Sequence, residues 1–585
     1  MEKFIPFVPK TLNLEDYAEL AFNHLTNNLD PNRNYLPYFH TIYESDPAEA
    51  RHEIFDYGDL TARYLDALIL YRYLTGSDQG RKYETRLKEL LLSYFDEDDG
   101  LCYRPAHTPL FSTAIHDADA VQFKIQKDLP VMYDCHVAEL FDQSRSLIGL
   151  ITWYMDTNEA FIKDKIDSLI EGLDRISIKK DDFCYFSKTE YPPGYTPAND
   201  EKPNHAPIYF GGSLIYPLLK YYELTKNRKA FHLAEGLLKH IIFHSNSYQT
   251  DGSFTGKDHN GQTHGRMSAL TGIIFYSILI DNQELLQWAK NAFDWFMGKG
   301  SSFGWFPEWI GRLEPSKEAC ETCTITDVIG CAILLAQSGY YEYWDHIERF
   351  SRNQLVENQL RDIKWMKSSK GKEDTWLSSF DNIPNRVKGG FAGWGGVNDF
   401  IGSNPIFSHR MMNCCSPAGV HGLYLIWENI VTEKNREVYV NLLLNHRSKW
   451  LKVHSYLPYE GKIIVSIDNS YIVNIKIPDW VNFSQINMSI NNQNRDFELA
   501  ESNKYIRVRD LQPGDTVTVE FPLRKEVIQE TVAGIDYQVY WRGNTVIRVL
   551  PEGKECPLYQ RNHFDNDQVI YEQKQYNLSL KKLLW

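Results

Sequence analysis

Apolar segments with helical spacing recur along the first 430 residues of the chain. The stretches that begin at Leu60, Ser146, Gly212, Met267 and Thr324 each predict an apolar helix, a short polar turn and an amphipathic helix. They are separated by roughly 55–85 residues, which is long for a simple solenoid. Helical hairpins that recur in this way, with long loops between them, predict a closed toroid of paired helices. An open superhelix is the alternative.

The pattern changes after about Asn429. Short β-branched segments with alternating apolar positions, such as 437–445, 462–469 and 471–480, are separated by Asn, Asp, Gly and Pro. They predict antiparallel strands in a β-sandwich. We therefore expect a mainly α chain with a β domain, in which residues 1–430 form the toroid and residues 431–585 form the C-terminal antiparallel β-sandwich.

Two loops between the predicted helices are long and rich in Pro, Gly and His, namely 191–212 and 388–415. Loops of this length in a compact domain are usually functional. We expect such loops to build a site at one mouth of the toroid, with the sandwich as a support or as part of the substrate rim.

The charge and aromatic content of the chain indicate which kinds of partner it can bind. Acidic residues outnumber basic ones by 77 to 62, so the net charge is −15. A negative field disfavours phosphate backbones, and no basic stripe offsets it, which argues against nucleic acid as a partner. Aromatic residues make up 14% of the chain, and their flat, partly polar surfaces suit a protein that binds sugars.

The hydrophobic segments of the sequence predict neither a signal peptide nor a transmembrane helix. The N-terminal segment 1–17 lacks the apolar run of about 7–15 residues that a secretory signal needs. The most apolar stretch, 272–280, is shorter than the ~20 residues that span a bilayer. We expect a cytoplasmic protein, or a periplasmic one if a signal peptide has been removed. The oligomeric state stays open, with a homodimer as one alternative.

The cysteines carry the main chemical signal. Nine cysteines in 585 residues are sparse and odd in number, so they do not form a disulfide framework. Two close pairs, Cys320/Cys323 and Cys414/Cys415, suit a zinc site with four thiolates. A second ligand set replaces Cys320 by Glu321. Since positions i and i+2 of a helix do not share a face, the spacing mildly favours the four-cysteine set. Four unligated core thiols are the remaining alternative.

These segments resemble motifs of glycoside hydrolase family 127, the β-L-arabinofuranosidases. Residues 321–323 resemble the Glu-Thr-Cys motif of that family, and residues 414–417 resemble its Cys-Cys-Pro motif. Weaker matches are a Gly-His-x-x-Arg segment at 263–266 and a Glu-Arg-x-x-x-Asn segment at 348–353. The resemblance covers most of the chain. It implies an (α/α)6 barrel followed by β-sandwich domains, which agrees with the pattern of helices and strands.

The resemblance also implies roles for individual residues. It makes Cys414 the nucleophile and gives zinc the ligands Glu321, Cys323, Cys414 and Cys415, which leaves Cys320 as a packing residue. The Gly-Glu-x-Phe motif that holds the acid/base of the family has become Pro307-Glu308-Trp309 here, so Glu308 is the candidate if a short deletion separates it from the zinc motif.

Four further residues are candidate substrate contacts: His264, His205, Glu348 and Trp305. Each has a plain structural alternative. The histidines can be satisfied structural side chains, Glu348 can be a salt-bridged carboxylate on a helix, and Trp305 can anchor a loop. Aromatic residues around Glu308 predict an apolar pocket that would raise the pKa of its carboxyl.

The function that these features predict is that of a retaining glycoside hydrolase, with a zinc-bound cysteine thiolate as nucleophile and a Glu as acid/base. The expected substrates are β-L-arabinofuranosides or a related plant or algal glycan sugar, as in bacterial polysaccharide degradation. One alternative is a toroid hydrolase or lyase in which zinc is purely structural. The other is a glycan-binding protein without catalytic activity.

Overall fold

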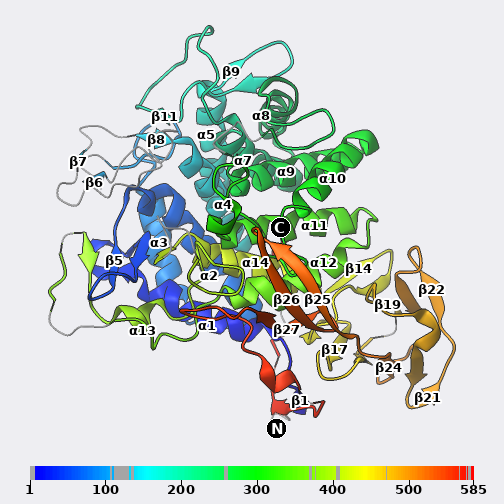
Figure 1. Ribbon diagram of the computed structural model, residues 1–585. Helices are drawn as coiled ribbons and strands as arrows, with labels where there is room; N and C mark the ends of the chain where they lie inside the picture. Colours follow the sequence, from blue (N-terminus) through cyan, green and yellow to red (C-terminus); the bar gives the residue numbers. More distant parts are fainter. Residues whose placement is uncertain are drawn as a thin grey trace.

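The computed structural model describes residues 7–105, 109–110, 131–132, 137–255, 261–367, 372–375, 377–402, 409–469, 471–565, 567–574, 576–577 and 582–585. Helices occupy the first three quarters of the chain, and strands dominate the remainder (Figure 1). None of the helices in these ranges is long and apolar enough to cross a bilayer.

Six helices form a closed inner ring. Each contacts the next in chain order, and the last contacts the first. The ring helices are α2 (Ala62–Thr75), α4 (Leu140–Thr157), α7 (Gly212–Thr225), α9 (Thr263–Leu279), α11 (Thr322–Gln337) and α14 (Cys415–Asn429). They are buried on nearly every side, as the continuous run of buried residues from Thr263 to Ser277 in α9 shows. A helix that is apolar all round is stable only in such an interior position.

Six more helices surround the ring and close each helical hairpin. These outer helices are α1 (Leu14–Asn27), α3 (Arg81–Leu92), α5 (Ala160–Ile176), α8 (Arg228–Lys239), α10 (Gln283–Met297) and α12 (Tyr343–Phe350). Each contacts a ring helix and buries one stripe of its surface, as expected for an amphipathic helix. The predicted toroid of paired helices is therefore confirmed, and the open superhelix is not formed.

Strands take over directly after the last ring helix. One sheet has the order β14-β15-β19-β23-β22, from Val431–Lys434, Glu437–Val440, Ile472–Lys476, Tyr505–Val508 and Glu498–Ala500. A second has the order β16-β17-β18-β24-β20-β21, from His446–Arg447, Leu451–Ser455, Lys462–Ile467, Thr516–Glu520, Asn487–Ile490 and Gln493–Asn494. Alternate residues of β17, β18 and β24 are buried, which is typical of sheets with one covered face.

Two features depart from a simple antiparallel sandwich. Strands β15 and β19 pair in parallel. A separate three-stranded sheet follows, made of β25 (Lys525–Val532), β26 (Ile535–Arg542) and β27 (Thr545–Leu550). The last described residues return to the ring, where Leu583 N donates to the Tyr424 hydroxyl of α14. The division into domains at residues 430 and 431 stays a prediction.

A small sheet brings an early segment of the chain to the start of α14. Strand β4 (His40–Ile42) pairs with β5 (Glu49–Arg51) on one side and with β13 (Arg410–Met412) on the other. Strand β13 ends two residues before Cys414, and Asn413 N donates to Phe39 O at 2.7 Å. The N-terminal segment therefore holds in place the chain that leads into the cysteine pair.

Candidate metal centre

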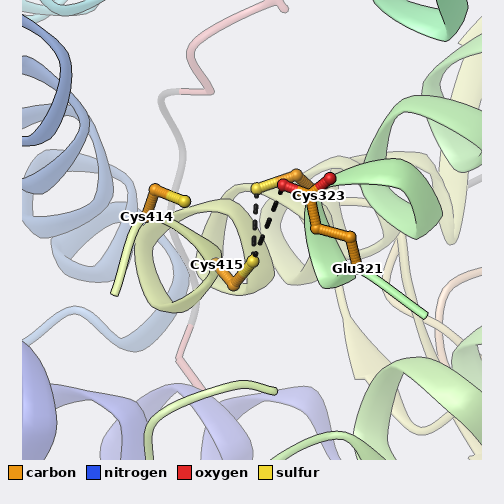
Figure 2. Close-up of side chains that lie close together, drawn as sticks. All are labelled: Glu321, Cys323, Cys414 and Cys415. Carbon is orange, nitrogen blue, oxygen red and sulfur yellow. Dashed lines mark hydrogen bonds between the residues drawn. The ribbon is translucent and has the colours of Figure 1, made fainter. Parts of the chain in front are cut away.

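Four potential ligands meet at the amino ends of two neighbouring ring helices. Glu321 and Cys323 come from the start of α11, and Cys414 and Cys415 come from the start of α14 (Figure 2). Their ligand atoms all lie within 4.8 Å of one another, and all four side chains are buried. Cys323 Sγ lies 3.5 Å from Cys415 Sγ, which is 3.9 Å from Glu321 Oε1.

The chain conformation before α11 explains why Glu321 belongs to this group and Cys320 does not. Glu321 is the N-cap of α11 and has extended backbone angles, φ −92° and ψ 128°. Cys320 pairs with Gly395 in an antiparallel bridge, and neighbouring residues of an extended chain point to opposite sides. The helical spacing rule does not apply to a residue that precedes the helix. The four-cysteine set favoured by spacing is therefore wrong, and Cys320 is a buried packing residue.

Cys414 and Cys415 also lie at the amino end of a helix. Cys414 is the N-cap of α14, and Cys415 is its first residue. The amino end of a helix carries a partial positive charge, which favours a thiolate there. Hydrogen bonds from the Cys323 and Cys415 thiols, with the nearby Arg63 guanidinium, lower the pKa of Cys414 to about 6, whereas burial raises that of Cys323 to about 11. These contacts therefore favour the thiolate form of Cys414.

The donor set suits zinc. In a tetrahedral site with Zn–S bonds of 2.3 Å, the sulfur atoms lie about 3.8 Å apart. The 3.5 Å between Cys323 Sγ and Cys415 Sγ is close to this separation, so small side-chain rotations would complete the site. Three thiols and one carboxylate are ligand types that zinc binds in proteins. The described residues at this place therefore fit a zinc ion.

Cationic side chains from two other ring helices lie beside the cluster. Arg63 of α2 places Nη1 3.8 Å from Cys323 Sγ and Nη2 3.2 Å from His264 Nε2. Arg145 of α4 places Nη2 3.4 Å from the same His264 nitrogen. On its other side, His264 Nδ1 is 2.5 Å from Asp327 Oδ2. The sequence argument missed both arginines, although a charged residue within an apolar helical stretch was an available signal.

These contacts orient the His264 ring. Its Nε2 faces the Nη2 atoms of Arg63 and Arg145, and its Nδ1 faces Asp327 Oδ2. Burial lowers the pKa of the ring, but the Asp327 carboxylate raises it, and the net shift is upward. Such a chain of contacts orients groups around a metal ligand. His264 therefore lies next to the cluster, and its predicted contact with substrate stays a prediction.

Glu308 lies close to the cluster and is held by its backbone. Its carbonyl oxygen accepts from Thr263 N at the start of α9, and its amide donates to Ala319 O, both at 2.8 Å. Only 4% of its surface is exposed, and Oε2 has no hydrogen-bond partner in the described part of the chain. Burial, with the nearby carboxylates of Glu321 and Glu318, raises the pKa of Glu308 well above its usual range. This is the environment that a proton-donating carboxylic acid needs.

Two predicted substrate contacts are buried and hydrogen-bonded within the protein, and their contact with substrate stays a prediction. Trp305 is 1% exposed, and its Nε1 donates to Gly395 O at 3.4 Å. Glu348 is buried on the outer helix α12, where it accepts from Arg352 Nε and from Leu443 N, each at 2.9 Å. It is the salt-bridged carboxylate of the structural alternative.

His205 lies apart from these residues. It is exposed in the segment before the short helix α6 (Pro207–Phe210), with its ring 6.3 Å from that of Phe210. Its predicted contact with substrate stays a prediction.

Metal content gives a direct test of the ligand set. We expect one zinc per chain in the wild type. The Cys415→Ser variant should bind zinc more than ~100-fold more weakly, since loss of a ligand exceeds the 10–100-fold cost of losing an outer contact. Elemental analysis after dialysis against a competing chelator measures this. The matched control is Cys320→Ser, which should keep its zinc. Equal zinc loss in both variants would contradict the ligand set.

The structural role of Glu348 gives a second test. Because Glu348 satisfies the buried Leu443 amide and Arg352, Glu348→Gln should lower the free energy of unfolding by about 1–3 kcal/mol. A thermal or urea melt measures this change. The exposed Glu342→Gln at the start of the same helix is the control and should melt like the wild type. A raised KM with an unchanged melting curve would restore the substrate contact.

Comparisons with known proteins relate the fold to three solved structures. A GH127 β-L-arabinofuranosidase from Geobacillus stearothermophilus T6 is 15% identical, with a TM-score of 0.58 over 92% of this chain and 86% of that chain. A second GH127 β-arabinofuranosidase is 14% identical, with a TM-score of 0.59 over 93% of this chain and 86% of that chain. A further glycoside hydrolase is 12% identical, with a TM-score of 0.59 over 92% and 81%.

No protein-family model matches the sequence, and no curated protein matches it either. At such low identity the structural matches speak for the fold. The barrel and sandwich expected from the resemblance to family 127 are therefore confirmed as the architecture of this chain, which it shares with the GH127 structures.

Proposed function

We propose that this protein is a retaining glycoside hydrolase with Cys414 as its nucleophile and Glu308 as its acid/base. The observation that carries the proposal is the convergence of Glu321, Cys323, Cys414 and Cys415 within 4.8 Å at the amino ends of two ring helices. The buried carboxyl of Glu308, with one oxygen free of hydrogen bonds, supports it.

The residues divide the reaction into two displacements. Cys414 Sγ attacks the anomeric carbon of the sugar, the bond to the leaving oxygen breaks, and Glu308 gives its proton to that oxygen. In the second step the Glu308 carboxylate takes a proton from water. The water oxygen then bonds to the anomeric carbon, the C–S bond breaks, and Cys414 leaves as a thiolate. Two inversions give net retention.

The role of Cys414 depends on its ionisation. A free cysteine has a pKa of about 8.5 and is mostly protonated at neutral pH. Zinc held by Glu321, Cys323, Cys414 and Cys415 would keep the thiols deprotonated at pH 7. The same contacts restrain Cys414 at the start of α14, so that its sulfur keeps one position through both steps.

The substrate class follows from the architecture. β-L-Arabinofuranosides, or a related plant or algal glycan sugar, are the expected substrates, because the solved structures that share this fold across most of their length include GH127 β-L-arabinofuranosidases. The candidate site lies at the amino ends of the ring helices, where segments that connect the helices can contact a glycan.

Hydrolysis of a panel of 4-nitrophenyl glycosides tests the function. The panel should include α- and β-L-arabinofuranosides, arabinopyranosides and uronides. We expect zinc-loaded protein to hydrolyse at least one furanoside, and proton NMR of the first product to show a retained anomeric configuration. An inverted product would contradict the mechanism. Binding without turnover across the whole panel would instead indicate a glycan-binding protein.

A further inference from the structure

The ring encloses a cavity behind the thiols. All six ring helices line it, from Cys323 and His264 at one end to the Trp585 side chain at the other. Its volume is about 100 Å³, which is room for several water molecules. Trp585 Nε1 donates to Thr152 Oγ1 at 3.0 Å, which fixes the indole at the far end. The cavity therefore lies inside the ring and extends from the thiol cluster to Trp585.

Most charged groups of the cavity wall have partners. Arg63 Nε lies 2.5 Å from Asp59 Oδ1. Asp66 Oδ2 lies 2.7 Å from His421 Nδ1 and Oδ1 accepts from Thr152 Oγ1 at 2.6 Å. The remaining carboxylate, Asp327, accepts from His264. These groups are paired within the wall.

Arg145 is different. It is 6% exposed, and in the described part of the chain it has no carboxylate within ion-pair distance. Its guanidinium lies over the Phe141 ring, 4.4 Å from the centroid, and its only polar contact among the described residues is His264 Nε2 at 3.4 Å. Arg145 Nε is buried and has no hydrogen-bond partner in the part of the chain that the structure describes.

Such a group is costly unless something pairs with it. Burial, and the like charge of Arg63, lower the pKa of Arg145. A buried cation is normally paired with an anion, and an orphaned buried donor indicates a missing ion or ligand. Two guanidinium groups that converge on a single histidine nitrogen leave donors free for an oxyanion.

We infer that the cavity behind the thiols binds a carboxylate, with its oxygens accepting from Arg145 and from the neighbouring Arg63. The planar guanidinium fork matches carboxylate geometry. The carboxylate can belong to an acidic sugar or to a free small acid. The acidic-sugar source rests on the proposed function, whereas the free acid does not.

Isothermal titration calorimetry on the full zinc-loaded chain tests this site. The probes are D-galacturonate and D-galactose, which differ only in the carboxylate, together with sodium acetate and inorganic phosphate. We expect galacturonate to bind at least 10-fold more tightly than galactose. If acetate binds with an affinity similar to that of galacturonate, the ligand is a free small acid. If galacturonate binds and acetate does not, the ligand is an acidic sugar. Binding of phosphate alone, or of no anion, overturns the inference.

Variants assign the binding to Arg145. Arg145→Gln should weaken galacturonate at least 10-fold, and the matched control Ser268→Ala, in the same wall, should change its affinity less than twofold. Unchanged affinity in Arg145→Gln overturns the inference. If Arg145→Gln fails to fold, competition between chloride and galacturonate in the wild type tests the site instead. Raising sodium chloride from 50 to 500 mM should weaken galacturonate at least fivefold, and an unchanged affinity overturns the site.

This readout is independent of turnover. A protein that binds galacturonate through Arg145 but hydrolyses no glycoside refutes the proposed hydrolase and leaves the carboxylate site intact. An active hydrolase that binds no carboxylate refutes the site alone.

Discussion

Replacing Cys414 by serine is expected to lower kcat by a factor of ~10³ or more. A serine hydroxyl stays protonated at neutral pH and is a poor nucleophile. Neighbouring thiols lower the pKa of Cys414, which is the N-cap of α14, and the substitution removes the proposed attacking sulfur itself. Single-turnover kinetics on the best aryl glycoside of the panel measure the effect.

Cys320, which lies outside the ligand cluster, provides the control for this variant. Cys320 is buried next to Glu321 but lies outside the ligand cluster, so Cys320→Ser should keep kcat within about twofold. Zinc content and melting curves of both variants separate loss of chemistry from loss of the fold. If Cys414→Ser retains full turnover, Cys414 is not the nucleophile.

Replacing Glu308 by glutamine is expected to lower kcat/KM by ~10²–10⁴-fold for glycosides with poor leaving groups. The amide fills the same buried position but has no proton to give. A 4-nitrophenolate leaving group needs little protonation, so the first step should suffer less with aryl substrates. A loss that depends on the leaving-group pKa is therefore the signature of the acid. The exposed Glu314→Gln is the matched control and should behave like the wild type.

The pH profile gives Glu308 a second readout. Burial and the neighbouring carboxylates raise the pKa of this carboxyl, so its acid form persists above the usual range of a glutamate. Activity should fall only as the pH rises through that raised pKa, because the donor then loses its proton. In Glu308→Gln this alkaline limb should disappear. An identical alkaline limb in the variant and the wild type would assign it to another group.

Hydrophobic periodicity was sufficient to predict the ring and the strands. Each ring helix is mostly apolar and buried, and each outer helix has one apolar stripe, so the order of paired helices is visible in the sequence. The parallel pairing of β15 and β19 was not visible. It depends on which strands meet after intervening residues have folded elsewhere, and alternation within a strand carries no such information.

The ligand set shows where spacing rules fail. Helical geometry favoured Cys320 over Glu321, yet Glu321 lies just before α11 in an extended conformation. The bridge between Cys320 and Gly395 sets that conformation, and Gly395 is far away in the sequence. The ligand set implied by the family motif coincides with the four side chains that the structure brings together, because the motif reflects this three-dimensional arrangement and local spacing does not.

The surroundings of Trp305 and Glu348 were not predictable for the same reason. Residue type suggested substrate contacts, but the partners that hold these side chains, Gly395 O and Leu443 N, come from distant segments. Arg145 and Arg63 lie in apolar helices, and only closure of the ring brings them to the thiols. Residue type alone does not reveal which face of a helix closes onto a site.

The most direct test of the nucleophile is to trap it. A 2-deoxy-2-fluoro glycoside of the preferred sugar, with a good leaving group, should slow the second step more than the first and leave the sugar attached to the enzyme. Intact-protein mass spectrometry should then show one sugar per chain, and peptide mapping should place it on Cys414. A label on a carboxylate, or turnover of the same compound with no label on Cys414, would contradict catalysis by this sulfur.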